Sequence, residues 1–172
     1  MKRIITLFAI IGLLAFSGCT TNDDNVDSDT IAEVIDVNNV NFDLNGNGGV
    51  RRFGFTLFPG DVVLAYRATG VENGRTVWTQ IPETYYYYDD GTQYFTYKFN
   101  FTDVDFELYL DGFELNTVPA NLRTGQKFRI VIVPGTNPSI INKSVNNKVD
   151  YSDYYAVIKR YNINDSNVKQ LN

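Results

Sequence analysis

Carboxylates are the residues of this chain most able to do chemistry, because its 172 residues include no histidine and a single cysteine, Cys19. Histidine is the usual general base near neutral pH, so its absence excludes Ser-His-Asp hydrolases and histidine-zinc sites. Glycoside hydrolysis needs only two carboxylates facing each other across a cleft. The acidic residues available for such a pair are Asp89, Asp90, Asp103, Asp105, Glu107 and Glu114. Acidic β proteins carry many such residues in turns and on solvated strand faces, so a small carboxylate-dependent hydrolase is the least favoured function and we expect no enzyme.

Aromatic residues suggest a second kind of site, for a glycan. Sugar rings stack on flat aromatic faces, and the candidates here are Trp78 and the run Tyr85, Tyr86, Tyr87 and Tyr88. Successive side chains of a strand point to opposite faces, so only two of the four tyrosines share a face and one pair is expected in the core. The other pair either binds sugar or forms ordinary cross-strand contacts. We favour the cross-strand contacts.

A weak calcium site is suggested by Asp43, Asn45 and Asn47, whose oxygens alternate before Gly48 as in the first half of a calcium loop. The twelfth position of that pattern is Gly54, where a bidentate Glu is needed. We therefore favour a hairpin loop and expect neither a metal nor another cofactor.

The first residues have the pattern of an export signal. Lys2 and Arg3 precede an uncharged apolar run of 13 residues, Ile4 to Phe16, which suits a signal peptide and is short for a membrane-spanning helix. The segment from Leu14 to Cys19 resembles a lipobox, and its Phe-Ser-Gly-Cys ending resembles those of lipoproteins of the Bacteroidota. This resemblance implies a lipoprotein signal peptide over residues 1–18, lipidation of Cys19 and anchoring in the outer membrane.

Residues 19–30 are predicted to form a flexible acidic tether behind the lipidated cysteine. Asp23 and Asp24 resemble the acidic export tag of surface lipoproteins in the same phylum, which implies a domain exposed at the cell surface. A periplasm-facing anchor is the alternative, since a solvated linker has the same composition. Asp29-Thr30-Ile31 resembles an O-glycosylation signal of that phylum, which makes Thr30 a candidate sugar site.

Net charge argues against a nucleic-acid partner. Removing residues 1–18 takes away two of the 15 basic residues and none of the 20 acidic ones, so the mature net charge is −7. Phosphate backbones call for clustered Lys and Arg, which this chain lacks. The expected partners are the membrane, through the lipid, and an unidentified protein or glycan.

The elements that would position these residues are short strands. Alternating apolar residues predict strands over 39–44, 53–57, 104–110 and a hairpin of 85–88 with 93–101, while 61–68, 76–81 and the β-branched run 128–133 predict three more. Tyrosines at helical spacing predict one helix over Asp150–Ile163, capped by Asp150. The expected fold is all-β, an antiparallel β-sandwich (Ig-like or similar) over 31–163 with one short C-terminal helix, followed by a polar tail at 164–172.

These observations favour a non-enzymatic, lipid-anchored cell-envelope protein that serves as a surface interaction or assembly module. A carbohydrate-binding module that uses exposed aromatics is the alternative. An open groove lined by Trp78 and at least two tyrosines would favour the alternative, and a deep cleft with two facing carboxylates would favour the hydrolase.

Overall fold

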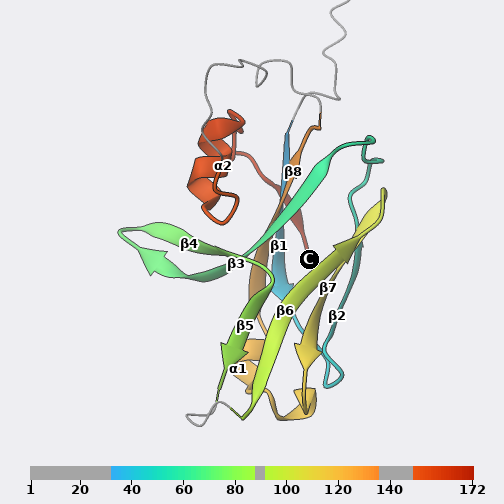
Figure 1. Cartoon of the computed structure of the whole chain (residues 1–172), viewed down its shortest axis with the longest axis vertical. Coiled ribbons are helices and arrows are strands. Elements are labelled where there is room, and N and C mark those ends of the chain that lie inside the picture. Colours follow the sequence, from blue (N-terminus) through green and yellow to red (C-terminus); the bar gives the residue numbers. More distant parts are fainter. Residues whose placement is uncertain (1–31, 88–91, 136–148) are drawn as a thin grey trace, which may run out of the picture.

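The computed structural model describes residues 32–87, 92–135 and 149–172, which form two β-sheets packed face to face (Figure 1). Strands make up 50% of the described residues and helices 11%, so the prediction of an all-β sandwich with one short helix is confirmed. The signal peptide, Cys19, the tether and Thr30 lie outside the described residues, as do Tyr88, Asp89 and Asp90.

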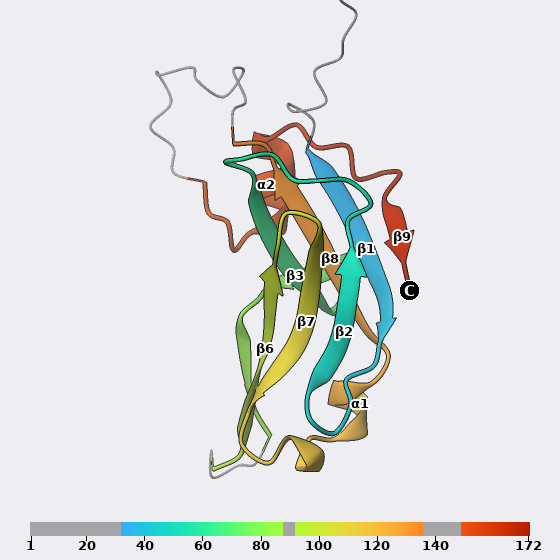
Figure 2. The same ribbon diagram turned by 90° about the vertical axis from the view of Figure 1, so that its right-hand side faces the viewer.

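One sheet has five strands. In spatial order they are β4 (Arg75–Gln80), β3 (Val62–Glu72), β8 (Gln126–Val133), β1 (Glu33–Val40) and β9 (Lys169–Leu171). The first three pairings are antiparallel, whereas β9 runs parallel to β1 (Figure 2). The polar tail predicted at 164–172 is therefore part of the domain, because Leu171 packs against the core and the backbone of β9 extends the sheet.

The other sheet has four antiparallel strands. In spatial order they are β2 (Asn47–Arg52), β7 (Asp105–Gly112), β6 (Tyr94–Phe101) and β5 (Glu83–Tyr86). The 3-10 turn η2 (Leu115–Thr117) and the short helix α1 (Ala120–Arg123) connect β7 to β8. The outer face of this sheet carries polar pairs that join neighbouring strands, such as Thr84 with Thr96 and Asn100 with Glu107.

The central strand β8 shows how the chain builds two apolar layers. Phe128, Ile130 and Ile132 point between the sheets, and Val131 and Val133 point to the opposite face. Both faces of the strand are covered, which is why its sequence is apolar almost throughout. The inner layer forms the sandwich core, and the outer layer forms a second cluster of buried residues.

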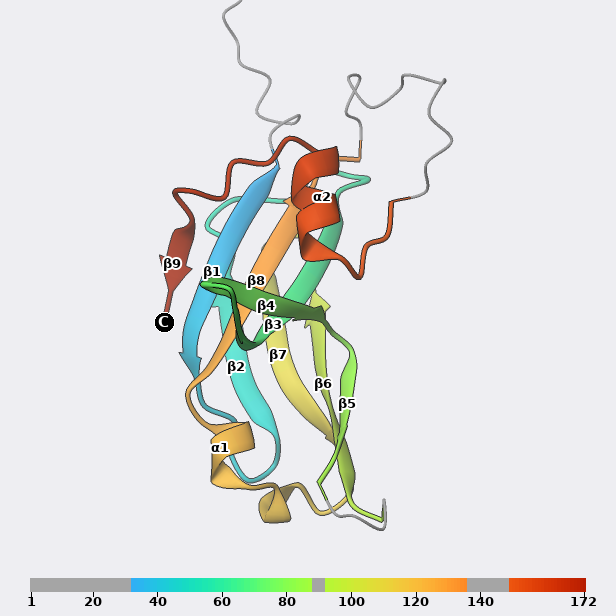
Figure 3. The same cartoon turned by 90° about the vertical axis from the view of Figure 1, so that its left-hand side faces the viewer.

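Helix α2 (Tyr154–Arg160) covers the outer face of the five-stranded sheet (Figure 3). Tyr154 and Val157 are its buried residues, and both join the outer apolar layer. The helix is shorter than predicted and is capped by Asp153, whose side chain accepts a hydrogen bond from the Ala156 N–H at 3.1 Å. The predicted cap, Asp150, instead accepts hydrogen bonds from Ser152 in the preceding turn.

Two predicted strands are displaced. β1 ends at Val40 and β2 begins at Asn47, so the apolar residues of 39–44 and 53–57 lie mostly in loops. Phe42 and Phe53 are nevertheless buried in the core, because these loops fold back over the ends of the sandwich. The glycine-rich stretch 45–49 leads into β2, and Gly48 lies within that strand. Glycine is needed there because a Cβ on residue 48 would lie 2.6 Å from the Leu108 carbonyl oxygen.

Within the described part of the chain, the longest helix is α2 with seven residues, and none of the helices has the length and apolar character needed to cross a membrane.

Candidate functional site

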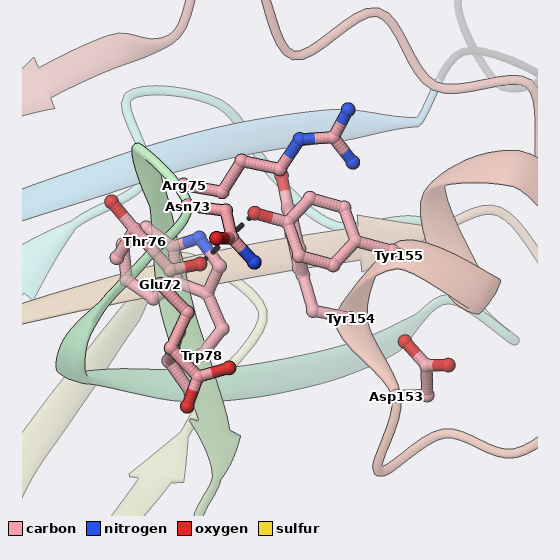
Figure 4. Close-up of a pocket in the computed structure, with 9 residues that line it drawn as sticks. Glu72, Asn73, Arg75, Thr76, Trp78, Asp153, Tyr154 and Tyr155 are labelled. Carbon is pink, nitrogen blue, oxygen red and sulfur yellow. Dashed lines mark hydrogen bonds between the residues drawn. The ribbon is translucent and has the colours of Figure 1, made fainter.

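A groove lies between the β3–β4 hairpin and the start of α2 (Figure 4). Its volume of about 560 Å³ falls within the range of roughly 300–1,000 Å³ that is usual for ligand sites. The hairpin contributes residues 72–73 and 75–78, and the helix contributes residues 153–155. The two walls are far apart in sequence, so the groove exists only when α2 is docked on the sheet.

The hairpin places polar side chains at one wall of the groove. Asn73 and Gly74 form its turn with positive φ angles of 49° and 76°, as a two-residue hairpin turn requires. Glu72 and Arg75 are paired across this turn and lie at its tip. The hairpin extends away from the sandwich (Figure 1), so these side chains are exposed and available for hydrogen bonds.

Three aromatic residues form the base and the opposite wall. The ring of Tyr154 lies 5.8 Å from that of Trp78 and 5.1 Å from that of Tyr155, measured between centroids. The Tyr155 hydroxyl donates a hydrogen bond to the Thr76 carbonyl oxygen at 2.9 Å, which joins the helix to the hairpin. Trp78 and Tyr154 are buried, whereas Tyr155 is 44% exposed. Tyr155 is therefore the ring that offers a face to a ligand.

Below the groove, a buried ion pair holds this wall in place. Arg129 donates two hydrogen bonds to Asp36, at 2.6 and 3.0 Å, and one to the Tyr154 hydroxyl at 2.6 Å. Its guanidinium also lies over the Trp78 ring, 4.5 Å from the centroid. The Tyr154 hydroxyl in turn donates to Asp165 at 2.6 Å. One arginine on the sheet thereby orients both buried rings of the groove.

Charge pairing controls the ionisation of this network. Burial by itself would raise the pKa of Asp36, but hydrogen bonds and charge from Arg129 and Lys127 outweigh it and lower that pKa. Burial raises the pKa of Tyr154, and its hydrogen bond to Asp165 acts in the same direction. Asp36 is thus held as a carboxylate and Tyr154 as a neutral phenol. The charged Asp36 can pair with Arg129, and the protonated Tyr154 can donate its hydrogen bond to Asp165.

The candidate glycan-binding aromatics are divided between the two sheets. Trp78 lies in the groove, but Tyr85 and Tyr86 belong to β5 in the other sheet, and Tyr87 follows directly after that strand. Tyr85 packs against the sandwich core and its hydroxyl accepts a hydrogen bond from the buried Arg67 at 2.6 Å. Tyr86 is 67% exposed on the outer face, where it forms a cross-strand pair with Tyr94.

Tyr87 also packs against the core, and its hydroxyl is hydrogen bonded to Thr117 at 2.9 Å. Tyr85 and Tyr87 are thus the expected core pair, because alternate residues of the strand face inward. Trp78 and the described tyrosines of the run lie in different sheets, although β4 and β5 follow each other directly in the sequence.

The predicted carboxylates do not face each other across the groove. Asp105 and Glu107 lie two residues apart in β7, on the outer face of the sheet, where they accept hydrogen bonds from Thr102 and Asn100. Glu114 accepts a hydrogen bond from Gln93 at 3.4 Å, and Asp103 is exposed in the β6–β7 turn.

The groove carries two other carboxylates, which the sequence did not single out. Glu72 lies on the hairpin side and Asp153 on the helix side (Figure 4). Asp153 is engaged as the cap of α2, and both residues are exposed to solvent. The acid of a glycosidase works from a site shielded from water, so this pair lacks the environment of the predicted hydrolase.

The candidate calcium ligands form a closed loop. Asp43 accepts hydrogen bonds from the Asn45 N–H and the Asn47 N–H, both at 2.8 Å, and from the Asn47 side chain at 2.9 Å. The Asn47 hydrogen bonds, followed by those from Asn45 and Gly46, lower the pKa of Asp43. The loop connects strands of different sheets, so the hairpin prediction was wrong. Among the described residues there is no cluster of three or more His, Cys, Asp or Glu that could hold a metal.

Comparisons with known proteins leave the groove as the main guide to function. No model of a protein family matches the chain. Among curated proteins none matches, and the same holds for solved structures.

Proposed function

We propose that this chain is a non-enzymatic, lipid-anchored protein of the cell envelope whose β-sandwich domain binds a ligand at the cell surface. The groove between the β3–β4 hairpin and α2 carries the proposal. It combines an exposed aromatic ring, Tyr155, with polar side chains at the hairpin tip, and this combination of an apolar face with a few polar groups is typical of ligand sites.

The ionisable groups near the groove support binding over catalysis. Asp36, Arg129 and Tyr154 are committed to one another, and that network holds the aromatic wall in a single arrangement. A preformed wall reduces the ordering that a ligand must impose when it binds. The groove is thus organised as a recognition surface.

The lipid anchor is supported by the sequence pattern that ends at Cys19. Cells grown with an alkyne-bearing fatty acid test it: the protein is captured, coupled to a fluorescent azide and separated by electrophoresis. We expect fluorescence on the wild type and none on Cys19→Ser. Equal labelling of the two proteins would show that the lipid is elsewhere, and absence of label from the wild type would remove the anchor from the proposal.

The surface location is supported by Asp23 and Asp24, and it is tested by treating intact cells with a protease. We expect the wild-type protein to be digested. The variant Asp23→Asn with Asp24→Asn should be protected, because it lacks the acidic residues behind the cysteine. Protection of the wild type in intact cells, with digestion after lysis, would place the domain on the periplasmic side.

A further inference from the structure

We infer that the groove binds a neutral pyranose unit of a glycan, stacked on Tyr155 and hydrogen bonded by the tip of the β3–β4 hairpin. This inference rests on the proposed function and adds the chemical class of the ligand. The residues that carry it are Tyr155, Glu72, Asn73 and Arg75.

Tyr155 has the properties of a stacking platform. Its hydroxyl is tied to the Thr76 carbonyl oxygen, and its ring packs edge-to-face on Tyr154 at an interplanar angle of 73°. Tyr154 is itself held by Arg129 and Asp165. The Tyr155 ring is therefore fixed from two sides while 44% of the residue stays exposed. A rigid aromatic face of this kind binds a flat apolar surface at a small cost in side-chain entropy.

The hairpin tip supplies groups that suit hydroxyls. Glu72 accepts hydrogen bonds, Arg75 donates them, and the Asn73 amide does both. Each hydroxyl of a sugar both donates and accepts hydrogen bonds, so the hydroxyls of one ring match all three side chains. A purely apolar ligand would cover these groups without satisfying them, which costs free energy.

Charge narrows the class of ligand further. The rim carries two carboxylates, on Glu72 and Asp153, and one cation, on Arg75. The full chain is acidic, with a formal net charge of −5, and without residues 1–18 the net charge is −7. Phosphorylated, sulfated or sialylated ligands would meet a net negative rim, so the electrostatics favour a neutral ring. An aromatic face beside mixed donors and acceptors then points to a neutral hexose.

The test uses the lipidated protein purified in detergent micelles and applied to an array of neutral and anionic hexose oligosaccharides. The strongest neutral binder is then titrated in solution by calorimetry. We expect Tyr155→Ala to weaken binding about tenfold or more, because it removes the stacking ring. Tyr155→Phe should lose clearly less affinity than Tyr155→Ala, because it keeps the stacking ring and gives up only the hydrogen bond to Thr76 that helps to fix it. Tyr86→Ala is the matched control: it removes an exposed tyrosine from the other sheet and should leave binding unchanged.

Several outcomes would overturn the inference. They are a wild type that binds no neutral oligosaccharide, a preference for anionic ones, and equal losses in Tyr155→Ala and Tyr86→Ala. Loss of binding in Tyr155→Phe as severe as in Tyr155→Ala would also overturn it, because the ring would then not be what the sugar contacts. Incubation of the bound oligosaccharide followed by mass spectrometry separates the two proposals. Shorter products would refute the non-enzymatic function, whereas failure to bind would refute only the choice of ligand.

Discussion

Replacement of Asp36 by Asn should destabilise the domain strongly, because it removes the charge that compensates Arg129 beneath α2. Asp36 is 3% exposed and accepts two hydrogen bonds from Arg129. It also forms an ion pair with Lys127, whose Nζ lies 3.1 Å from the Asp36 carboxylate. Removing one partner of a buried ion pair typically costs about 3–5 kcal/mol. Asn keeps one acceptor, and Lys127 is partly exposed and regains water, so we expect a loss of about 2–4 kcal/mol.

Trp78 makes this loss measurable, since it is the only tryptophan of the chain and lies against Arg129. Urea unfolding followed by Trp78 fluorescence should show the Asp36→Asn midpoint about 1–2 M below that of the wild type, given a slope of roughly 2 kcal/mol per M. The control is Asp111→Asn, which removes the partner of Lys98 from an exposed ion pair on the other sheet. It should leave the midpoint nearly unchanged.

The pH dependence gives a second, independent check. The folded state lowers the pKa of Asp36 below its ordinary value of 3.8, so its stabilising effect is complete above that value and is lost as the pH falls through the folded pKa. The gap between wild type and Asp36→Asn should therefore be full at neutral pH and narrow on acidification below about pH 4. A gap that is as large in acid as at neutral pH, or absent at neutral pH, would refute the role assigned to this ion pair.

Three further predictions concern packing, capping and alkaline stability. Gly48→Ala should cost about 1–3 kcal/mol in urea unfolding, because its Cβ would meet a backbone carbonyl of β7, whereas Gly70→Ala, with open space around it, should cost little; equal effects would contradict the close approach. Asp153→Ala should cost about 1 kcal/mol by removing the cap of α2, and an unchanged melting temperature would show that the cap is dispensable. Burial raises the pKa of Tyr66 and Tyr97 above the ordinary value of 10.0. The free energy of unfolding, measured with urea at a series of alkaline pH values, should therefore be full below pH 10 and fall as the pH rises beyond it. A free energy of unfolding that does not change over this range would contradict their burial.

Periodicity in the sequence was a sound guide wherever a strand lies in the middle of a sheet. Phe95, Tyr97, Phe99 and Phe101 alternate along the predicted strand and were expected to share a core face. Phe95 and Tyr97 are buried and Phe99 packs against the core, but Phe101, at the end of β6, is 46% exposed. The β-branched run at 128–133 was predicted as a strand and forms most of β8, with apolar layers on both sides. In these strands each side chain has neighbours on a fixed face, so the alternation of residue types reports the geometry directly.

Prediction failed where apolar residues are buried by loops. Phe42 and Phe53 carry the same alternation as strand residues, yet they fill the core from loop positions outside the strands. The groove could not be predicted from the sequence, because it forms only when α2 docks beside the hairpin. No local sequence pattern indicates that Tyr155 contacts Thr76. Charged residues inside apolar runs, Arg129 in β8 and Asp36 in β1, were visible signs that polar groups must cover that face.

The pairing of β9 with β1 has a consequence for the order in which the domain can assemble. Ile35 lies opposite Ile130 on one side and Lys169 on the other, so the first strand of the sheet has both neighbours from the second half of the chain. Contacts between such distant positions form slowly, because long loops must close before the contacts repay their entropy. β1 therefore stays an unpaired edge until both β8 and β9 are available, so this sheet is completed late in folding.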